Sequence, residues 1–293
     1  MDCEAPDGGL IAERYHLPSL KYLYKVKVNA QTSLHGLICV CGKNNKLVLW
    51  NPLTGEFKVL INPCAKKVKV LGLYYTGTSN KDYKLLSVTS ILNVHTYSLK
   101  SNSWRKVDSI DNYQTLSDLG VRRGAISSST WFNGNLYFLI ERSVLKFDTQ
   151  MEKFTIIPTH PSFKDLNIKV LTMNLKKGVI HLGVKYETEI SLHQQSKKAC
   201  IQLWRMTTDE IWEKVGLSYR VDISMDPFHW LRNKTWLMIE SLDQKLYKVD
   251  CSKSYTKGKK FITGGKSVPI VKMDEGYAKL NYMESFMPID GSI

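Results

Sequence analysis

Aromatic residues form a repeat between Trp50 and Tyr247. In three copies a β-rich run ends on an aromatic, a polar turn follows, and a second aromatic stands seven positions after the first. These pairs are Trp50 with Phe57, Tyr97 with Trp104, and Phe147 with Phe154. Trp204 to Trp212 is a copy one residue longer, and Tyr247 begins a weaker fifth copy. The first aromatics lie 43 to 57 residues apart, which is the period of a propeller blade.

The segments around the repeat predict an all-β chain. Few windows keep apolar residues at helical spacing, whereas short runs rich in β-formers recur between Gly, Asn, Lys and Ser residues. The pair Asn133-Gly134 is the strongest turn signal, because a type I′ hairpin turn needs positive φ at both central residues. Lys177-Gly178 and Asn233-Lys234 stand in comparable places before the next apolar run. Hairpins are therefore expected in series.

A series of small antiparallel sheets with this period favours a β-propeller-like, kelch-like fold. One such sheet cannot bury both of its faces, so it must stack on neighbours of the same kind. The repeat and its flanking segments predict six blades; five or seven blades, or a long open sandwich, are the alternatives. In each case the paired aromatics are expected to lie in the core, between blades.

Charge and hydropathy narrow the class of protein. The chain carries a formal net charge of +14, which attracts acidic partners. Its lysines stand mostly singly or in pairs at turns, and the cluster Lys257–Lys260 lacks interleaved aromatics, so nucleic acid is not predicted as a partner. No apolar run is long enough for a membrane span, and no signal peptide is apparent. We expect a cytoplasmic or nuclear protein without membrane contact.

Residues that carry chemistry are scattered. The six cysteines form no C-x-x-C pair, and only Cys39 and Cys41, on one face of a predicted strand, offer an alternative reading as metal ligands. No motif of a hydrolase, a metalloprotease, a nucleotide-binding loop or a dinucleotide-binding domain is present. The seven histidines are dispersed. The sequence therefore predicts no cofactor, no metal and no enzymatic activity.

An ordered series of motifs resembles one family along nearly the whole chain. The motifs are LHGLICV (34–40), LVLWNPLTGEFKVL (47–60), KDYKLLSV (81–88), VHTYSLKSNSWRKV (94–107), WFNGNLYFL (131–139), VLKFDTQMEKFTIIP (144–158), QLW (202–204) and YMESF (282–286). Together they are similar to the F-box-associated domain, type 1, of plant F-box proteins, which include the S-locus type.

This resemblance implies a protein-binding module that recruits a target protein to an SCF-type cullin ubiquitin ligase. The domains expected from it are an N-terminal segment at 1–33, partly joined to the propeller and without an F-box, an F-box-associated propeller at 34–289, and a tail at 290–293. Binding to a Skp-type adaptor and cullin would then require an F-box. The alternative is a free-standing F-box-less interaction module or scaffold.

Irregular connections are where a propeller is expected to bind its partner, and Trp, Tyr and Arg are the usual anchors there. The residues predicted to bind protein lie in or near such connections. They are Tyr74, Tyr75, Arg122, Arg123, Tyr186, Phe228, His229, Trp230 and Arg232.

Overall fold

The computed structural model describes most of the chain from residue 29 to residue 272. The described ranges are 29–41, 47–61, 68–77, 82–89, 91–107, 110–119, 126–140, 142–163, 166–176, 178–188, 198–222, 225–230, 235–240, 245–250 and 268–272. The chain divides into two compact units, one of residues 1–156 with 276–293 and the other of residues 157–275.

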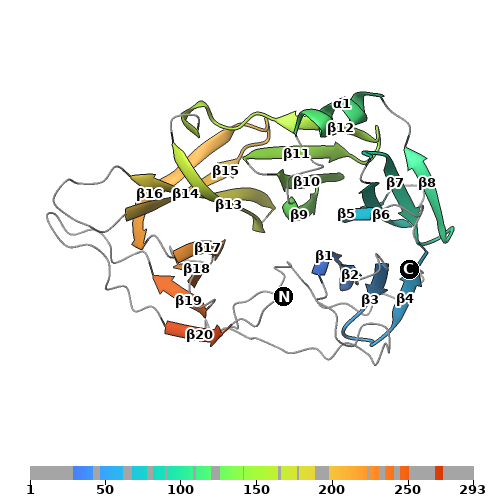
Figure 1. The fold of residues 1–293 in the computed structure, drawn as a ribbon, viewed down its shortest axis with the longest axis horizontal. Helices are drawn as coiled ribbons and strands as arrows, with labels where there is room; N and C mark the ends of the chain where they lie inside the picture. The colour runs from blue at the N-terminus through green and yellow to red at the C-terminus, as the bar shows by residue number, and fades with distance from the viewer. Residues whose placement is uncertain are drawn as a thin grey trace, which may run out of the picture. The chain divides into compact units, whose positions relative to one another are not determined.

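The first unit contains three four-stranded antiparallel sheets, and each sheet keeps its strands in chain order (Figure 1). The first sheet is β1 (Asn29–Leu34), β2 (Leu37–Cys41), β3 (Leu47–Trp50) and β4 (Phe57–Leu60). The second is β5 (Val68–Thr76), β6 (Asp82–Thr89), β7 (Val94–Ser98) and β8 (Ser103–Val107). Helix α1 (Ile110–Asp118) leads to the third sheet, β9 (Ile126–Phe132), β10 (Asn135–Ile140), β11 (Ser143–Asp148) and β12 (Lys153–Ile157).

The second unit contains two more sheets of the same kind. The 3₁₀-helix η1 (Pro161–Phe163) precedes the fourth sheet, β13 (Asn167–Lys176), β14 (Val179–Thr188), β15 (Lys198–Met206) and β16 (Trp212–Asp222). The fifth sheet is β17 (Met225–Trp230), β18 (Thr235–Glu240), β19 (Lys245–Asp250) and β20 (Val268–Lys272). Five sheets are thus described, and the number of six blades stays a prediction.

The aromatic repeat marks the same place in every sheet. The first aromatic of each copy lies on the third strand, from Trp50 on β3 to Tyr247 on β19. In the first two sheets the second aromatic stands directly opposite it on the fourth strand, as Trp50 opposes Phe57. Cross-strand aromatic pairs stabilise antiparallel sheets. The repeat is therefore the outer hairpin of each four-stranded unit.

The six residues between the paired aromatics form one recurring turn. Directly after the first aromatic, the Asn51 side-chain oxygen accepts hydrogen bonds from two amides of the turn, at 3.0 and 3.4 Å. In the third sheet the Asp148 side-chain oxygen likewise accepts two amide hydrogen bonds, each at 2.8 Å. Four positions later the backbone is left-handed, at Gly55, Asn102 and Glu152. Short polar side chains and glycine suit these two roles, so local chemistry fixes the hairpin.

Two hydrophobic cores lie between consecutive sheets of the first unit. One contains residues of the first and second sheets, including Leu49, Leu60 and Tyr97, and the other contains residues of the second and third, including Phe147 and Phe154. The aromatic pair of a sheet thus faces the sheet before it. The prediction that all repeat aromatics are core was wrong for Phe57, which is 41% exposed because no described sheet precedes the first one. Trp104 is half-buried.

The first strand of every sheet carries a β-bulge. In each sheet one residue of this strand is left without an opposite partner: Gln31, Leu71, Ser127, Lys169 and Phe228. In the first unit, β1, β5 and β9 contact one another, and the buried Thr32 hydroxyl accepts hydrogen bonds from the Leu73 amide (3.1 Å) and the Ser129 hydroxyl (3.4 Å). The first strands are therefore the innermost ones.

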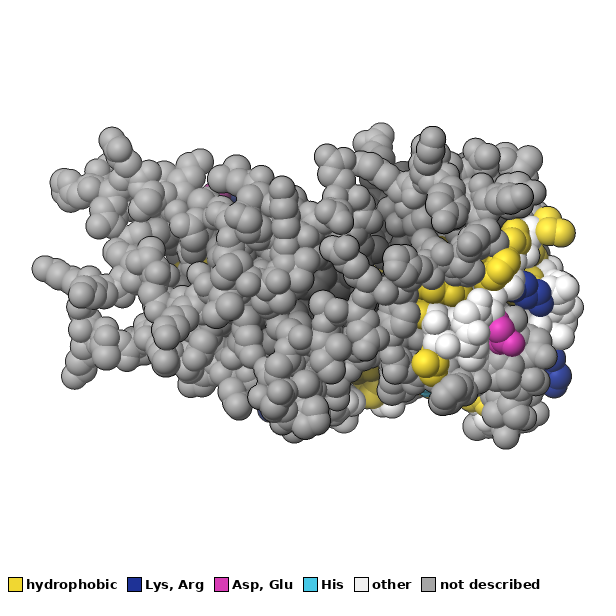
Figure 2. Space-filling model, turned by 90° about the horizontal axis from the view of Figure 1, so that it is seen from below, with side chains coloured by type: hydrophobic (Ala, Val, Ile, Leu, Met, Phe, Trp, Pro, Cys, Tyr) yellow, Lys and Arg dark blue, Asp and Glu magenta, His cyan; other side chains and the backbone are white. Residues whose placement is uncertain are grey.

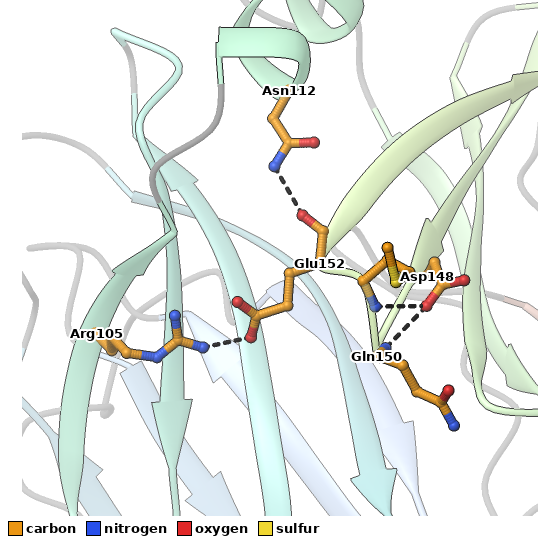
Figure 3. A network of polar contacts seen from close by, with 6 residues as sticks. Arg105, Asn112, Asp148, Gln150 and Glu152 are labelled. Carbon is orange, nitrogen blue, oxygen red and sulfur yellow. Dashed lines mark hydrogen bonds and ion pairs between the residues drawn. The ribbon is translucent and has the colours of Figure 1, made fainter.

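Helix α1 is held on the outer strand of the third sheet by the buried side-chain amide of Asn112. The Asn112 side chain donates to the Glu152 carbonyl at 2.9 Å (Figure 3). It also accepts a hydrogen bond from the Phe154 amide at 2.9 Å. The Glu152 carboxylate also pairs with Arg105 of β8, which raises the pKa of that guanidinium. Leu116 of the same helix enters the core between the second and third sheets.

Replacing Asn112 with alanine is expected to lower the free energy of unfolding by about 2 kcal/mol, because it leaves a buried amide and a carbonyl without their hydrogen bonds. Urea unfolding followed by tryptophan fluorescence measures the change. Gln114→Ala, on the exposed side of the same helix, is the matched control and should change stability by less than about 0.5 kcal/mol. Equal effects of the two substitutions would contradict the role given to Asn112.

Candidate protein-binding site

The two adjacent tyrosines predicted to bind a partner lie inside strand β5, not in a connection. Tyr74 is fully buried and packs edge-on against Phe147, with ring centroids 6.2 Å apart. Burial, with the nearby Glu152 carboxylate adding to it, raises the pKa of its phenol. Tyr74 was predicted to lie in or near a connection; it lies within β5 close to its end, and its buried side chain is not available to a partner.

Tyr75 points to the other side of β5 and joins a group of four rings, in which Tyr83 is buried and the other three are half-buried. We call His35, Tyr75, Tyr83 and Trp131 the rim aromatic cluster. The His35 ring lies at its centre, edge-on to the three others at centroid distances of 6.3, 5.8 and 5.9 Å for Tyr75, Tyr83 and Trp131. The ring centroids of Tyr75 and Tyr83 are 4.9 Å apart. The cluster therefore joins all three sheets of the first unit.

The topology explains why these four rings meet. Each belongs to the first hairpin of its sheet, at or near the turn, and the first strands of the three sheets contact one another. His35 and Gly36 form a two-residue turn with φ of 46° and 81°. Asn133 and Gly134 form another, with φ of 46° and 74°, which confirms the predicted turn with positive φ at both residues. The ends of these first hairpins therefore bring the rings to one end of the unit.

The electrostatics of the cluster keep it neutral. The His35 Nδ1 atom and the Tyr83 hydroxyl are 2.8 Å apart and share a hydrogen bond. Burial lowers the pKa of His35, and burial together with the neighbouring Tyr75 raises the pKa of Tyr83 to about 12. Neutral rings with polar tips are well suited to contact another protein, since they supply large rigid apolar area and directed hydrogen bonds.

The remaining predicted residues lie apart from this cluster. Tyr186 is half-buried on β14, and its hydroxyl accepts a hydrogen bond from Gln202 Nε2 at 2.9 Å. Burial raises the pKa of that hydroxyl. Phe228, His229 and Trp230 belong to β17, where Phe228 is the bulged residue. Arg122, Arg123 and Arg232 lie outside the described residues. Only Tyr75 of the predicted set is thus placed in the cluster.

Sequence reasoning missed His35, Tyr83 and Trp131. A signal for two of them was present, because His35 belongs to a His-Gly pair and Trp131 stands two residues before Asn133-Gly134. Aromatic residues beside short hairpin turns are placed at the end of a sheet by the turn itself. Tyr83 gave no such signal.

Within the described residues, no group of three or more His, Cys, Asp or Glu side chains could hold a metal ion. Cys39 lies on β2 with a buried thiol that forms no disulfide. The same part of the chain has no helix with the length and apolarity needed to span a membrane.

Comparisons with known proteins assign the family. Residues 10–289 match the family model of the F-box associated beta propeller domain. Three relatives from Arabidopsis thaliana are F-box protein At2g07140 (24% identical, over 71% of this chain and 58% of the relative), F-box/kelch-repeat protein At3g44120 (24%, 73% and 60%) and F-box/kelch-repeat protein At4g05080 (23%, 88% and 62%). The chain spans about 60% of the length of these relatives.

Solved structures add little to this assignment. The N-terminal domain of Nup159 aligns with 83% of this chain and 65% of its own at 11% identity, with a TM-score of 0.37, and this likeness carries no argument. The family match and the series of four-stranded antiparallel sheets confirm the predicted all-β, propeller-like class. The chain belongs to the family of F-box associated β-propeller domains.

Proposed function

We propose that this chain is the substrate-recognition module of an F-box protein and recruits a target protein to an SCF-type cullin ubiquitin ligase. The observation that carries the proposal is the family match over residues 10–289, together with relatives that are themselves F-box proteins. Contact with a Skp-type adaptor and cullin belongs to the F-box of such a protein. The target is bound in the cytoplasm or the nucleus, and no membrane or nucleic acid takes part.

A recruiting module needs selective binding and no chemistry of its own. It acts by raising the effective concentration of its target near the ligase. The rim aromatic cluster offers a binding surface of this kind, because it is neutral, three of its four rings are only half-buried, and it lies on the first hairpins of three sheets. The net charge of +14 favours targets with acidic surfaces and speeds their encounter.

The test joins the chain to an F-box and measures its target in cells. We expect the abundance of a directly bound protein to fall when this fusion is expressed and to recover when the proteasome is inhibited. We expect Tyr75→Ala to weaken binding of the purified target at least tenfold, because half-buried aromatic anchors dominate protein interfaces. Tyr113→Ala, which removes an exposed tyrosine from helix α1, is the matched control and should bind normally.

Two outcomes would contradict the proposal at different points. A bound protein whose abundance and ubiquitination do not respond to the fusion would show an interaction module that acts outside ubiquitination. Unchanged binding by the Tyr75 variant, with the same melting temperature as the parent chain, would move the binding surface away from the rim aromatic cluster while leaving the recruiting role in place.

A further inference from the structure

The outer strand of the first sheet carries an exposed apolar row. Phe57 and Val59 of β4 and Ile61, directly after the strand, occupy every second position, so their side chains share one face. They are 41%, 49% and 86% exposed. Leu53 in the preceding turn is also exposed. Figure 2 views the first unit from the side of β3 and β4, where hydrophobic side chains gather beside basic and acidic ones. We call Phe57, Val59 and Ile61 the β4 row.

Two other outer strands, β8 and β16, carry charges where β4 carries apolar residues. Charged residues occupy the exposed positions of β8 (Arg105 and Lys106) and of β16 (Glu213 and Lys214). Charges of this kind are the usual means by which proteins prevent an edge strand from pairing with another chain. In β4 the row contains no charge, and the single lysine of the strand, Lys58, points to the opposite side.

The repeat explains how the row arises. The aromatic pairs of the second and third sheets face the sheet before them, and Phe154 is buried there. The corresponding face of the first sheet has Trp50 on its third strand, where it is buried, and Phe57 on its fourth, where it is exposed. The β4 row is therefore the outer margin of an apolar sheet face, and among the described residues β4 is the edge strand of its sheet.

The other side of β4 is basic. Lys58 shares this side of β4 with Leu60, whose side chain packs in the core toward the second sheet. Trp104 of β8 donates a hydrogen bond from Nε1 to the Ile61 carbonyl at 2.5 Å, so β8 lies next to the end of the row. Lys106 stands two residues after Trp104 and shares its side of β8. Two lysines thus line the side of β4 that faces the second sheet.

From these observations we propose that β4 is a docking edge for an extended segment of an acidic partner protein. Added beside β4, such a segment would hydrogen-bond through its backbone, place apolar side chains along the β4 row, and point the alternate, acidic side chains toward Lys58 and Lys106. The net charge of +14 supports an acidic occupant. This interaction is separate from the rim aromatic cluster and does not depend on ubiquitination.

The probes are two fluorescently labelled peptides, one alternating Glu and Val over seven residues and one alternating Lys and Val. We expect the acidic peptide to bind the full chain at least tenfold more tightly by fluorescence anisotropy, with an affinity that falls as salt rises. Val59→Ser with Ile61→Ser, and separately Lys58→Glu, should each weaken this binding at least tenfold. Met151→Ser with Ile156→Ser, at exposed apolar positions of the third sheet, is the matched control and should bind normally.

Three results would overturn the proposal. The first is no binding of the acidic peptide at about 1 mM, the affinity limit of a weak contact. The second is equal binding of the two peptides or equal binding by the β4 and control variants. The third is self-association of the chain in sedimentation experiments that the two β4 serines abolish, which would assign the edge to a second copy of this chain.

Discussion

Replacing Tyr74 with alanine is expected to lower the free energy of unfolding by about 4 kcal/mol, which is typical for truncating a fully buried aromatic. Tyr74 has no exposed surface and lies in the core between the second and third sheets, edge-on to Phe147. Alanine would leave a cavity that neighbouring strands fill only in part. Urea unfolding of the full chain measures the loss.

Tyr74→Phe is the matched control, because it keeps the ring and removes only the hydroxyl. Among the described residues this hydroxyl has no hydrogen-bond partner, although it is buried. We therefore expect the phenylalanine variant to be as stable as the parent chain or more stable by about 1 kcal/mol. A loss of more than about 1 kcal/mol would show that the hydroxyl is satisfied by a bound water or another group.

The regular parts of the fold could be predicted because their chemistry is local. Three features within eight residues define the outer hairpin. They are an aromatic, the polar side chain directly after it, which accepts amide hydrogen bonds, and a left-handed residue four positions after that polar residue. The pair Asn133-Gly134 likewise defines its own turn. The four-stranded sheets follow from repeating this unit. These features depend on neighbours in sequence, so a single chain reveals them.

The choice between Tyr74 and Tyr75 could not be predicted. Adjacent residues of a strand point to opposite faces, so only one tyrosine of the pair can enter the core. The bulge at Leu71 shifts this alternation by one residue and decides which of them does. Bulges occur in the first strand of all five described sheets but have no common residue type. Their position depends on contacts between strands far apart in sequence.

The exposure of Phe57 has a similar cause. Its place in the repeat equals that of the buried Phe154, and the two differ only in what covers them. Helix α1 and the second sheet pack in the core that contains Phe154. No described sheet precedes the first one to cover Phe57. A repeat predicts which face of a sheet is apolar, whereas the neighbours of that sheet decide how much of the face is buried.

Replacing Asp226 with asparagine is expected to lower the free energy of unfolding by about 3 kcal/mol, because it removes the carboxylate from a buried lysine. Lys185 of β14 is only 3% exposed at its side chain, and its Nζ lies 2.6 Å from Asp226 Oδ1 on β17. Asp226 is 37% exposed, so water screens the pair in part and the loss falls at the low end of the range for buried pairs. Thermal and urea unfolding measure it.

Lys185→Met separates the ion pair from the packing around it. Methionine keeps much of the length of the lysine side chain without a charge, so the single substitution should cost less than Asp226→Asn. The double variant should recover at least about 1.5 kcal/mol relative to Asp226→Asn alone, because the buried charge that needed a partner is gone. Strict additivity of the two substitutions would show that Lys185 and Asp226 act independently, and that the fourth and fifth sheets are joined by packing and not by this pair. Recovery of stability in the double variant would mean that the two residues act as a pair. The ion pair would then fix which side chains meet between β14 and β17, while apolar burial supplies the stability.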